Sequence, residues 1–244
     1  MVLTMFKYCL NIFNNLLEAY SLPLGFLSVF ASVIMILQLL RLNREYNAIA
    51  DEEGFNLLHL AAIKGDIETA RCLIEKGAEV DAKTTQGKTP LYIAARMKNY
   101  NVLELLIQKG ANVNELCPNE SALFVAANNG DEKLAKMLIE NNADINIKTA
   151  INGLTPLFWA AISDHKNVVN LLVEYGADVN VKDNNSQETI LHEMAHQGKL
   201  EIAKILLESG ASLIHKDKKG NNAMESSLKS KRIEVFKTIL AFQH

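Results

Sequence analysis

The chain from residue 51 onward repeats one pattern of apolar and polar positions about every 33 residues. Units begin near residues 54, 87, 119, 153, 187 and 220, so the spacings are 33, 32, 34, 34 and 33. A fixed period of this length indicates a stack of one supersecondary unit, in which each repeat contacts only its neighbours. We therefore expect a repeat domain over residues 51–244.

Each unit is predicted to begin with a short helix. A residue with a short side-chain oxygen stands where the helix N-cap would be, because such an oxygen can bind the first free amides. In the second unit Leu91, Ala94 and Ala95 then share one face, and the paired alanines allow neighbouring helices to approach closely. The six predicted N-caps are Asn56, Thr89, Ser121, Thr155, Thr189 and Asn222.

A second helix follows in each unit. In the second unit it turns Val102, Leu103, Leu106 and Ile107 inward, and Gly110 ends it as the residue best able to adopt a left-handed conformation. The distances from the N-cap to the end of the first helix, and from there to this glycine position, never vary. All length variation therefore falls in the loop that leads to the next N-cap.

The last unit departs from the pattern. Ser226, Ser227 and Lys229 replace the small apolar residues and the residue that follows them. A terminal repeat has one face without a neighbour, so we expect these polar residues to form a solvent-facing cap.

The first fifty residues have a different composition. Residues 1–20 are predicted to form an amphipathic helix, and residues 22–40 contain no charged side chain. At about 1.5 Å per residue this run is roughly 28 Å long, close to the ~30 Å hydrocarbon core of a bilayer. The sequence therefore predicts a single transmembrane helix over residues 21–41, followed by a linker over residues 42–50.

Two alternatives stay open for this region. The apolar run could be a hydrophobic cap on the first repeat of a soluble protein, or a signal peptide cleaved after the A-x-A form at Ala48-Ile49-Ala50. Arg41 and Arg44 follow the run, whereas Lys7 is the basic side chain before it, which favours cytoplasmic repeats. We therefore expect a single-pass membrane protein.

Charge and cysteine content exclude some classes. The chain has 25 basic and 28 acidic residues, a formal net charge of −3, which provides no basic footprint for nucleic acid. Three cysteines lie far apart without C-x-x-C spacing, so neither a disulfide framework nor a zinc ribbon is indicated. Cys72 is placed on the apolar face of a helix, where free cysteine behaves as a small hydrophobe.

One stretch matches a catalytic motif. His192, Glu193 and His196 spell H-E-x-x-H on a predicted helix, the arrangement that binds zinc in metallopeptidases. However, His192 also occupies a repeat position that His59 fills in the first unit. We therefore interpret the motif as scaffold and keep a zinc hydrolase as a remote alternative. The chain has no G-x-S-x-G and no Gly-rich phosphate loop, so we expect no cofactor, no resident metal and no enzyme activity.

These repeats resemble the ankyrin family. The stretches that match its T-P-L-H-x-A-A helix start and its G-A-D-V-N loop are 57–62, 155–161 and 176–180. The resemblance implies an all-α solenoid of helix pairs joined by β-hairpin-like loops. It also implies a concave surface, formed by the loop tips and by the two residues after the paired alanines, that binds a protein partner.

We call this surface the concave face. Specificity is expected where repeats differ, so Trp159, which aligns with Leu60 and Ile93, is predicted to have a packing role instead. The predicted protein-binding residues are Arg96, Met97, Cys117, Pro118, Asn128, Asn129, Ile151, Asn152, Leu154, Ile162, Ser163, Asn185 and Ser186.

Overall fold

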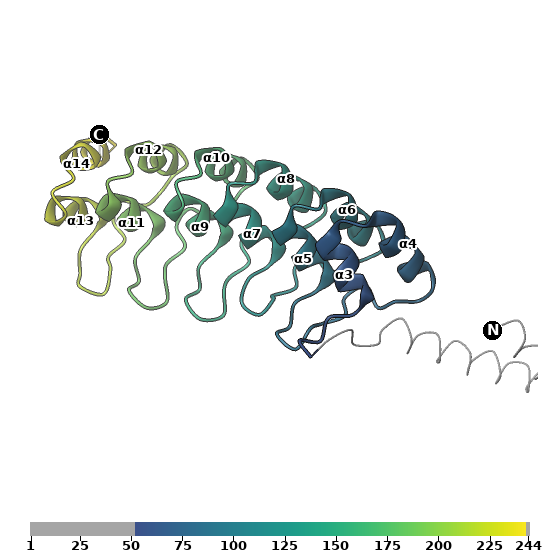
Figure 1. Cartoon of the computed structure of the whole chain (residues 1–244). Helices are drawn as coiled ribbons and strands as arrows, with labels where there is room; N and C mark the ends of the chain where they lie inside the picture. Colours follow the sequence, from purple (N-terminus) through teal and green to yellow (C-terminus); the bar gives the residue numbers. More distant parts are fainter. Residues whose placement is uncertain (1–51, 243–244) are drawn as a thin grey trace, which may run out of the picture. The chain divides into compact units, whose positions relative to one another are not determined.

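The computed structural model describes residues 52–242, which form six helix pairs stacked in one row (Figure 1). The first helices of the pairs are α3 (Leu57–Lys64), α5 (Pro90–Met97), α7 (Ala122–Asn129), α9 (Pro156–Ile162), α11 (Ile190–Gln197) and α13 (Ala223–Lys229). The second helices are α4 (Ile67–Glu75), α6 (Tyr100–Gln108), α8 (Glu132–Glu140), α10 (Lys166–Glu174), α12 (Leu200–Glu208) and α14 (Ile233–Ala241).

The six predicted N-caps are confirmed. Each begins a first helix from an extended conformation, and Pro90 and Pro156 follow at the first helical position. Proline fits there because the amide it lacks would have no partner within the helix. The Thr89 hydroxyl accepts from the Tyr92 amide at 3.3 Å, as the N-cap role requires.

The residue nine positions after each N-cap is left-handed in all six repeats. Three are glycine, whereas Lys98, Asp164 and Lys231 adopt φ values of 58°, 62° and 58°. A residue with a Cβ is disfavoured in this conformation by roughly 1–2 kcal/mol. The fixed interval of nine residues is therefore the distance from the N-cap to the left-handed residue, at which the chain leaves the first helix and changes direction.

Lys231→Gly is expected to stabilise the protein by about 1 kcal/mol or less, because relief of the left-handed penalty is partly offset by glycine's entropy in the unfolded chain. Gly198→Ala, at the same place one repeat earlier, is expected to destabilise it, since its φ is +80° and a Cβ there would approach Arg232 Cδ to 2.9 Å. Urea unfolding measures both changes, and a loss of stability in Lys231→Gly would contradict the prediction.

The core lies between the two rows of helices and between neighbouring first helices. The second alanine of each pair is 0 % exposed in the first five repeats, so adjacent first helices meet with no gap. Leu103 and Leu106 on α6 are also fully buried. The positions with fully buried second alanines are Ala62, Ala95, Ala127, Ala161 and Ala195.

The prediction for the last repeat was partly wrong. Ser226 and Ser227 are buried at 1 % and 0 % exposure, so they do not face solvent. Leu228, which replaces the second alanine, is 52 % exposed, and Lys229 is exposed. The reason is geometric. Ser226 and Ser227 are on the side of α13 that faces α14 and the preceding repeat, whereas Leu228 is on the side that no further repeat covers.

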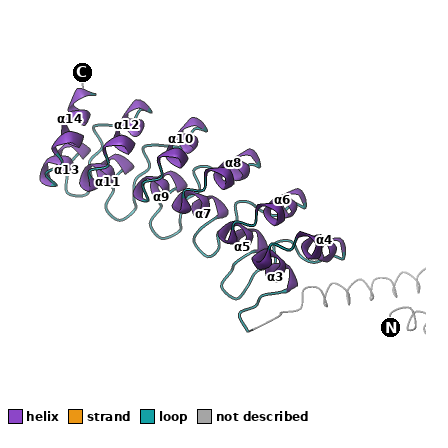
Figure 2. Ribbon diagram, turned by 45° about the horizontal axis from the view of Figure 1, so that its top comes forward, coloured by secondary structure: helices purple, strands orange, loops and turns teal. Residues whose placement is uncertain are grey.

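The loops between repeats are hairpins that all extend from the same side of the stack (Figure 1). Each is closed by a backbone bond to the residue before the N-cap, for example from Thr84 N to Lys88 O at 3.0 Å and from Cys117 N to Glu120 O at 2.8 Å. Figure 2 shows helix and loop but no strand arrow over the described residues, where one isolated bridge joins Lys182 and Thr189.

Hairpin length is where the repeats differ, as predicted. Between the two closing residues the third hairpin has only residues 118–119, whereas the fourth has residues 150–153 and the fifth residues 184–187. The helices on either side keep their spacing, so the hairpin tips absorb the entire variation in repeat length.

Carboxamide and carboxylate side chains tie the start of each hairpin to the next repeat. Asn146 Oδ1 accepts from Asp178 N at 2.8 Å, and Asn180 Oδ1 accepts from Ser212 N at 2.7 Å. Asp81 plays the same part toward Asn112 N. These bonds explain why the final position of the G-A-D-V-N loop holds Asn or Asp.

Two predictions concern exposure and the N-terminal region. Cys72 is exposed, not packed on the apolar face, because α4 directs Ala70 and Leu73 inward and turns Cys72 outward.

The predicted amphipathic helix, transmembrane helix and linker before residue 51 lie outside the described residues. Across residues 52–242 no helix is both long and apolar enough to cross a membrane.

Candidate functional site

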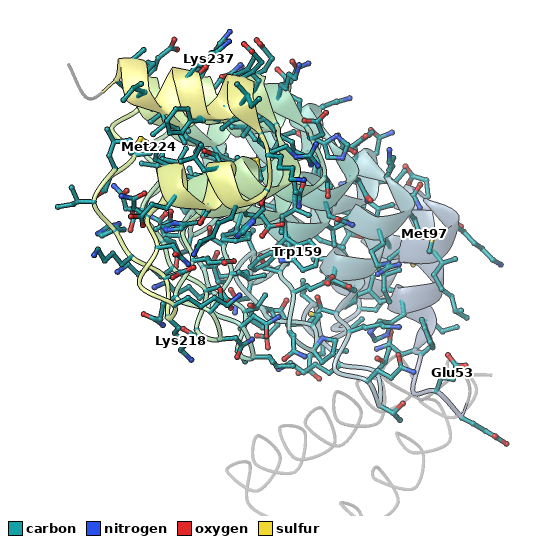
Figure 3. All side chains as sticks on the ribbon, turned by 90° about the vertical axis from the view of Figure 1, so that its left-hand side faces the viewer. Glu53, Met97, Trp159, Lys218, Met224 and Lys237 are labelled. Carbon is teal, nitrogen blue, oxygen red and sulfur yellow. The ribbon has the colours of Figure 1, made fainter. Side chains whose placement is uncertain are left out.

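The concave face combines the C-terminal ends of the first helices with the hairpin tips. Figure 3 views the stack from its C-terminal repeat, with α14 above α13 and the hairpins below. Of the predicted residues, Met97 is 51 % exposed on α5 and Ile151 is 68 % exposed on the fourth hairpin. Arg96, Pro118, Asn128, Asn129 and Asn185 are also exposed, and Asn152, Ile162, Ser163 and Ser186 are half-buried.

Two of the predicted surface residues are instead buried. Cys117 is 0 % exposed and Leu154 is 8 % exposed. Both belong to the base of a hairpin, where Cys117 N bonds to Glu120 O and Leu154 O accepts from Thr149 N. The Cys117 thiol lies 3.7 Å from the Thr89 hydroxyl, and burial raises the pKa of this thiol. Neither side chain is available to a partner.

The centre of the concave face is built from uncharged side chains of adjacent repeats. Ser163 Oγ donates to Asn128 Oδ1 at 3.1 Å, which joins the ends of α9 and α7. Asn185 Nδ2 donates to Asn152 Oδ1 at 3.0 Å, which joins the fifth and fourth hairpin tips. The structure therefore brings together four of the predicted residues in two pairs that sequence spacing alone does not reveal.

A charged cluster that the sequence did not single out borders this centre on the second and third repeats. Arg96 Nη1 donates to the Tyr92 hydroxyl at 3.3 Å, and that hydroxyl donates to Glu120 Oε2 at 3.4 Å. The guanidinium also lies 6.0 Å from the centre of the Tyr92 ring. Burial raises the pKa of Tyr92, so the phenol remains a donor at neutral pH.

A second cluster borders the centre on the fifth and sixth repeats. His196 Nε2 lies 3.3 Å from Glu188 Oε1, and His196 Nδ1 lies 2.8 Å from Ser230 Oγ. The Ser230 amide donates to Ser226 O. Ser230, His196 and Glu188 thus form a row of contacts like that of a serine-hydrolase triad. However, the Ser230 amide is already bonded and is not free to contribute to an oxyanion hole.

Trp159 is a residue of the first helix α9 and is labelled in Figure 3. Its side chain is half-buried, which agrees only in part with the predicted packing role. The indole Nε1 is buried and has no hydrogen-bond partner in the structure. The ring is therefore only partly enclosed, and its one polar atom is in the enclosed part.

His192 is a structural residue. It is 0 % exposed, and its Nδ1 accepts from Thr189 N at 3.2 Å. This fixes the proton on Nε2, which donates to Asn221 O at 3.1 Å in the next repeat. His59 makes the same contacts, with Asn56 N and with Lys88 O. Both ring nitrogens of His192 are thus engaged by backbone groups, which leaves neither available to a zinc ion.

The free energy of unfolding should decrease at pH values below neutral because of His192. Burial lowers the pKa of His192 beneath its ordinary value of 6.5, so the unfolded chain binds more protons as the pH falls below that value. The stabilisation is complete above about pH 6.5 and is lost toward the folded-state pKa, with a slope of at most about 1.4 kcal/mol per pH unit. Urea unfolding of wild type and His192→Gln from about pH 7.5 to 5 tests this; parallel profiles would contradict it.

A model for three copies of the ankyrin repeat matches residues 30–117 and 114–183, and a single-repeat model matches residues 186–218. Together these matches span more than half of the chain. The chain belongs to the ankyrin-repeat family. Ankyrin-repeat domains are typically non-catalytic and bind other proteins, which fits the scaffold role of His192.

Two curated relatives each match somewhat less than half of this chain. Mouse (Mus musculus) B-cell lymphoma 3 protein homolog is 35 % identical over 111 residues, which is 45 % of this chain and 25 % of that protein. A Caenorhabditis elegans transient receptor potential cation channel subfamily A member 1 homolog is 32 % identical over 108 residues, 44 % of this chain and 9 % of the channel. The chain thus spans a quarter or less of the length of these two relatives.

The fold also matches a solved ankyrin structure. The crystal structure of the ankyrin repeat domain of Bcl-3, described as a unique member of the IkappaB protein family, superposes with a TM-score of 0.72. The superposition covers 78 % of this chain and 87 % of that one at 24 % sequence identity. The similarity establishes the ankyrin fold of the repeats.

Proposed function

We propose that this chain is a non-enzymatic ankyrin-repeat adaptor, anchored to a membrane, that binds a protein partner through its concave face. The observation that carries the binding role is the uncharged centre of that face, from α7 to the fifth hairpin. Interface centres are depleted of charge, and Ile151 offers an exposed apolar contact there. The paired amides Asn152 and Asn185 can also exchange bonds with a partner's backbone.

The binding role can be tested by proximity labelling with the full-length chain. Ile151→Asp places a charge at the centre of the concave face and is expected to lower recovery of the partner about tenfold or more, since burying an unpaired charge is costly. Ile233→Asp is the matched control, because Ile233 is 60 % exposed on α14, outside the concave face. Equal recovery with both variants would contradict the proposal.

The membrane anchor is supported by the uncharged run over residues 22–40. We expect the full-length protein to resist carbonate extraction, and a Val33→Arg variant to be released, because a charge in the hydrocarbon core is unfavourable. The repeats should be digested by protease added to the cytoplasmic side. Full-length protein in the supernatant would instead indicate a hydrophobic cap on a soluble adaptor, and a product starting after Ala50 would indicate a secreted one.

A further inference from the structure

The six repeats are not joined equally. One connection between neighbours is a backbone bond from one hairpin tip to the preceding tip. It occurs from Thr85 N to Glu53 O at 3.0 Å, from Asn184 N to Asn152 O at 2.9 Å and from Lys218 N to Ser186 O at 2.9 Å. The third hairpin has Pro118 at this position, and proline has no amide hydrogen to donate. The fourth hairpin has Ala150 there, whose amide makes no such bond to the third tip.

A second connection is a side chain that donates to the carbonyl groups at the end of the preceding first helix. Asn99 Nδ2 donates to Ala62 O at 2.8 Å, and Arg232 Nε donates to His196 O at 3.2 Å. His165 and Lys199 bond in the same way at the joints between them. The corresponding residue of the third repeat is Asp131, whose ionised carboxylate can only accept.

The second helices of the second and third repeats are also separated at this joint. A cleft of about 370 Å³ lies between α6 and α8. Ile107 and Met137 are half-buried in its wall, and the rest of the lining consists of polar and charged side chains, Glu104, Gln108, Lys133, Lys136, Glu140 and Asn141. A smaller cleft of about 310 Å³ lies between α8 and α10 at the next joint. Among the joints of the described repeats, the one between α6 and α8 combines such a cleft with the loss of both other connections.

Side chains replace some of what is lost. The Tyr100 hydroxyl donates to Asp131 Oδ2 at 2.7 Å, and the Tyr92 hydroxyl donates to Glu120 Oε2 at a longer 3.4 Å. The loop bond that the joints share is kept, from Asp144 N to Asn114 Oδ1 at 2.7 Å. Asp131 thus caps α8 through Leu134 N and receives the Tyr100 hydroxyl, but it sends no bond to α5.

We propose that the joint between the second and third repeats is a built-in hinge, at which repeats one and two open as a unit from repeats three to six. In a solenoid each interface contributes separately to stability, so we expect the joint that lacks both of these connections, and whose outer helices are separated, to open first. The concave face is then made of two segments that can move relative to each other, with Met97 on one and Ile151 on the other.

Hydrogen exchange of the full-length chain in low concentrations of urea tests the hinge. Amides from α3 to α6 are expected to share one opening step that occurs more readily than that of α9 to α12. Tyr100→Phe removes a bond to a carboxylate and should increase opening of α3 to α6 roughly tenfold while leaving α9 to α12 unchanged. Tyr175→Phe, at an exposed tyrosine after α10, is the matched control.

A second variant should close the hinge. Lys98→Gly combined with Asp131→Asn recreates the arrangement of Gly65 and Asn99, in which the amide side chain packs over a left-handed glycine. The new amide can cap α8 and donate to the end of α5, so α3 to α6 should open roughly tenfold less often. Lys98→Gly alone measures how much of the change in opening is due to the glycine. One opening step shared by all helices, or equal effects of these variants across the chain, would overturn the proposal.

Discussion

His192→Ala is expected to lower the free energy of unfolding by about 3 kcal/mol or more. The substitution leaves a cavity at a fully buried site, removes the partner of Thr189 N and removes one of the two groups bonded to Asn221 O. Because Asn221 belongs to the next repeat, the loss should extend to the docking of the sixth repeat on the fifth. Urea unfolding monitored by circular dichroism gives the change.

The other histidine of the H-E-x-x-H stretch provides the control. The His196 side chain is 38 % exposed and contacts Glu188 and Ser230 at the surface, so His196→Ala should cost less than about 1 kcal/mol. If the motif instead bound zinc, both substitutions would abolish metal binding and a chelator would lower the wild-type melting temperature. Similar losses for the two variants, together with sensitivity to chelators, would contradict the scaffold role.

Leu106→Ala is expected to destabilise the protein by about 3 kcal/mol. Leu106 is 0 % exposed on the inner side of α6, and its neighbours Leu103 and Val102 are equally buried. The rigid helices of the stack cannot collapse fully around the space that the side chain leaves. The change is measured as a shift of the urea midpoint and as a lower melting temperature.

Ile107→Ala removes the same number of atoms from the next residue of α6. The Ile107 side chain is half-buried and lines the cleft between α6 and α8, so about 1 kcal/mol of stability should be lost there. Equal losses for the two substitutions would show that the cleft is closed in solution and that Ile107 is as buried as Leu106.

The helical scaffold was predictable because its signals are local. An N-cap oxygen, two alanines and a left-handed residue each act within one repeat, so Thr89, Ala95 and Lys98 could be assigned from spacing alone. Lys98 is informative here, because the constant interval placed the end of the first helix at this residue although it is not glycine. The resemblance to ankyrin repeats rested on the same local signals.

The candidate site was less predictable because its geometry depends on neighbouring repeats. Cys117 and Leu154 were assigned to hairpin tips by sequence, but the backbone bonds that place them at the hairpin base join residues whose pairing depends on hairpin length. The contact between Ser163 and Asn128 joins residues 35 positions apart. No property of either residue alone indicates that contact.

The hairpin tips have a practical consequence for anyone who modifies this protein. They range from two to four residues between closing bonds, while the helices before and after them keep their register. An epitope tag or a reporter peptide inserted between residues 150 and 153 would extend a loop whose closure entropy grows only slowly with length. The fourth tip is therefore a place where foreign sequence can be displayed at the centre of the concave face: the contacts of Asn152 with the fifth tip would be lost, but the helices would keep their register.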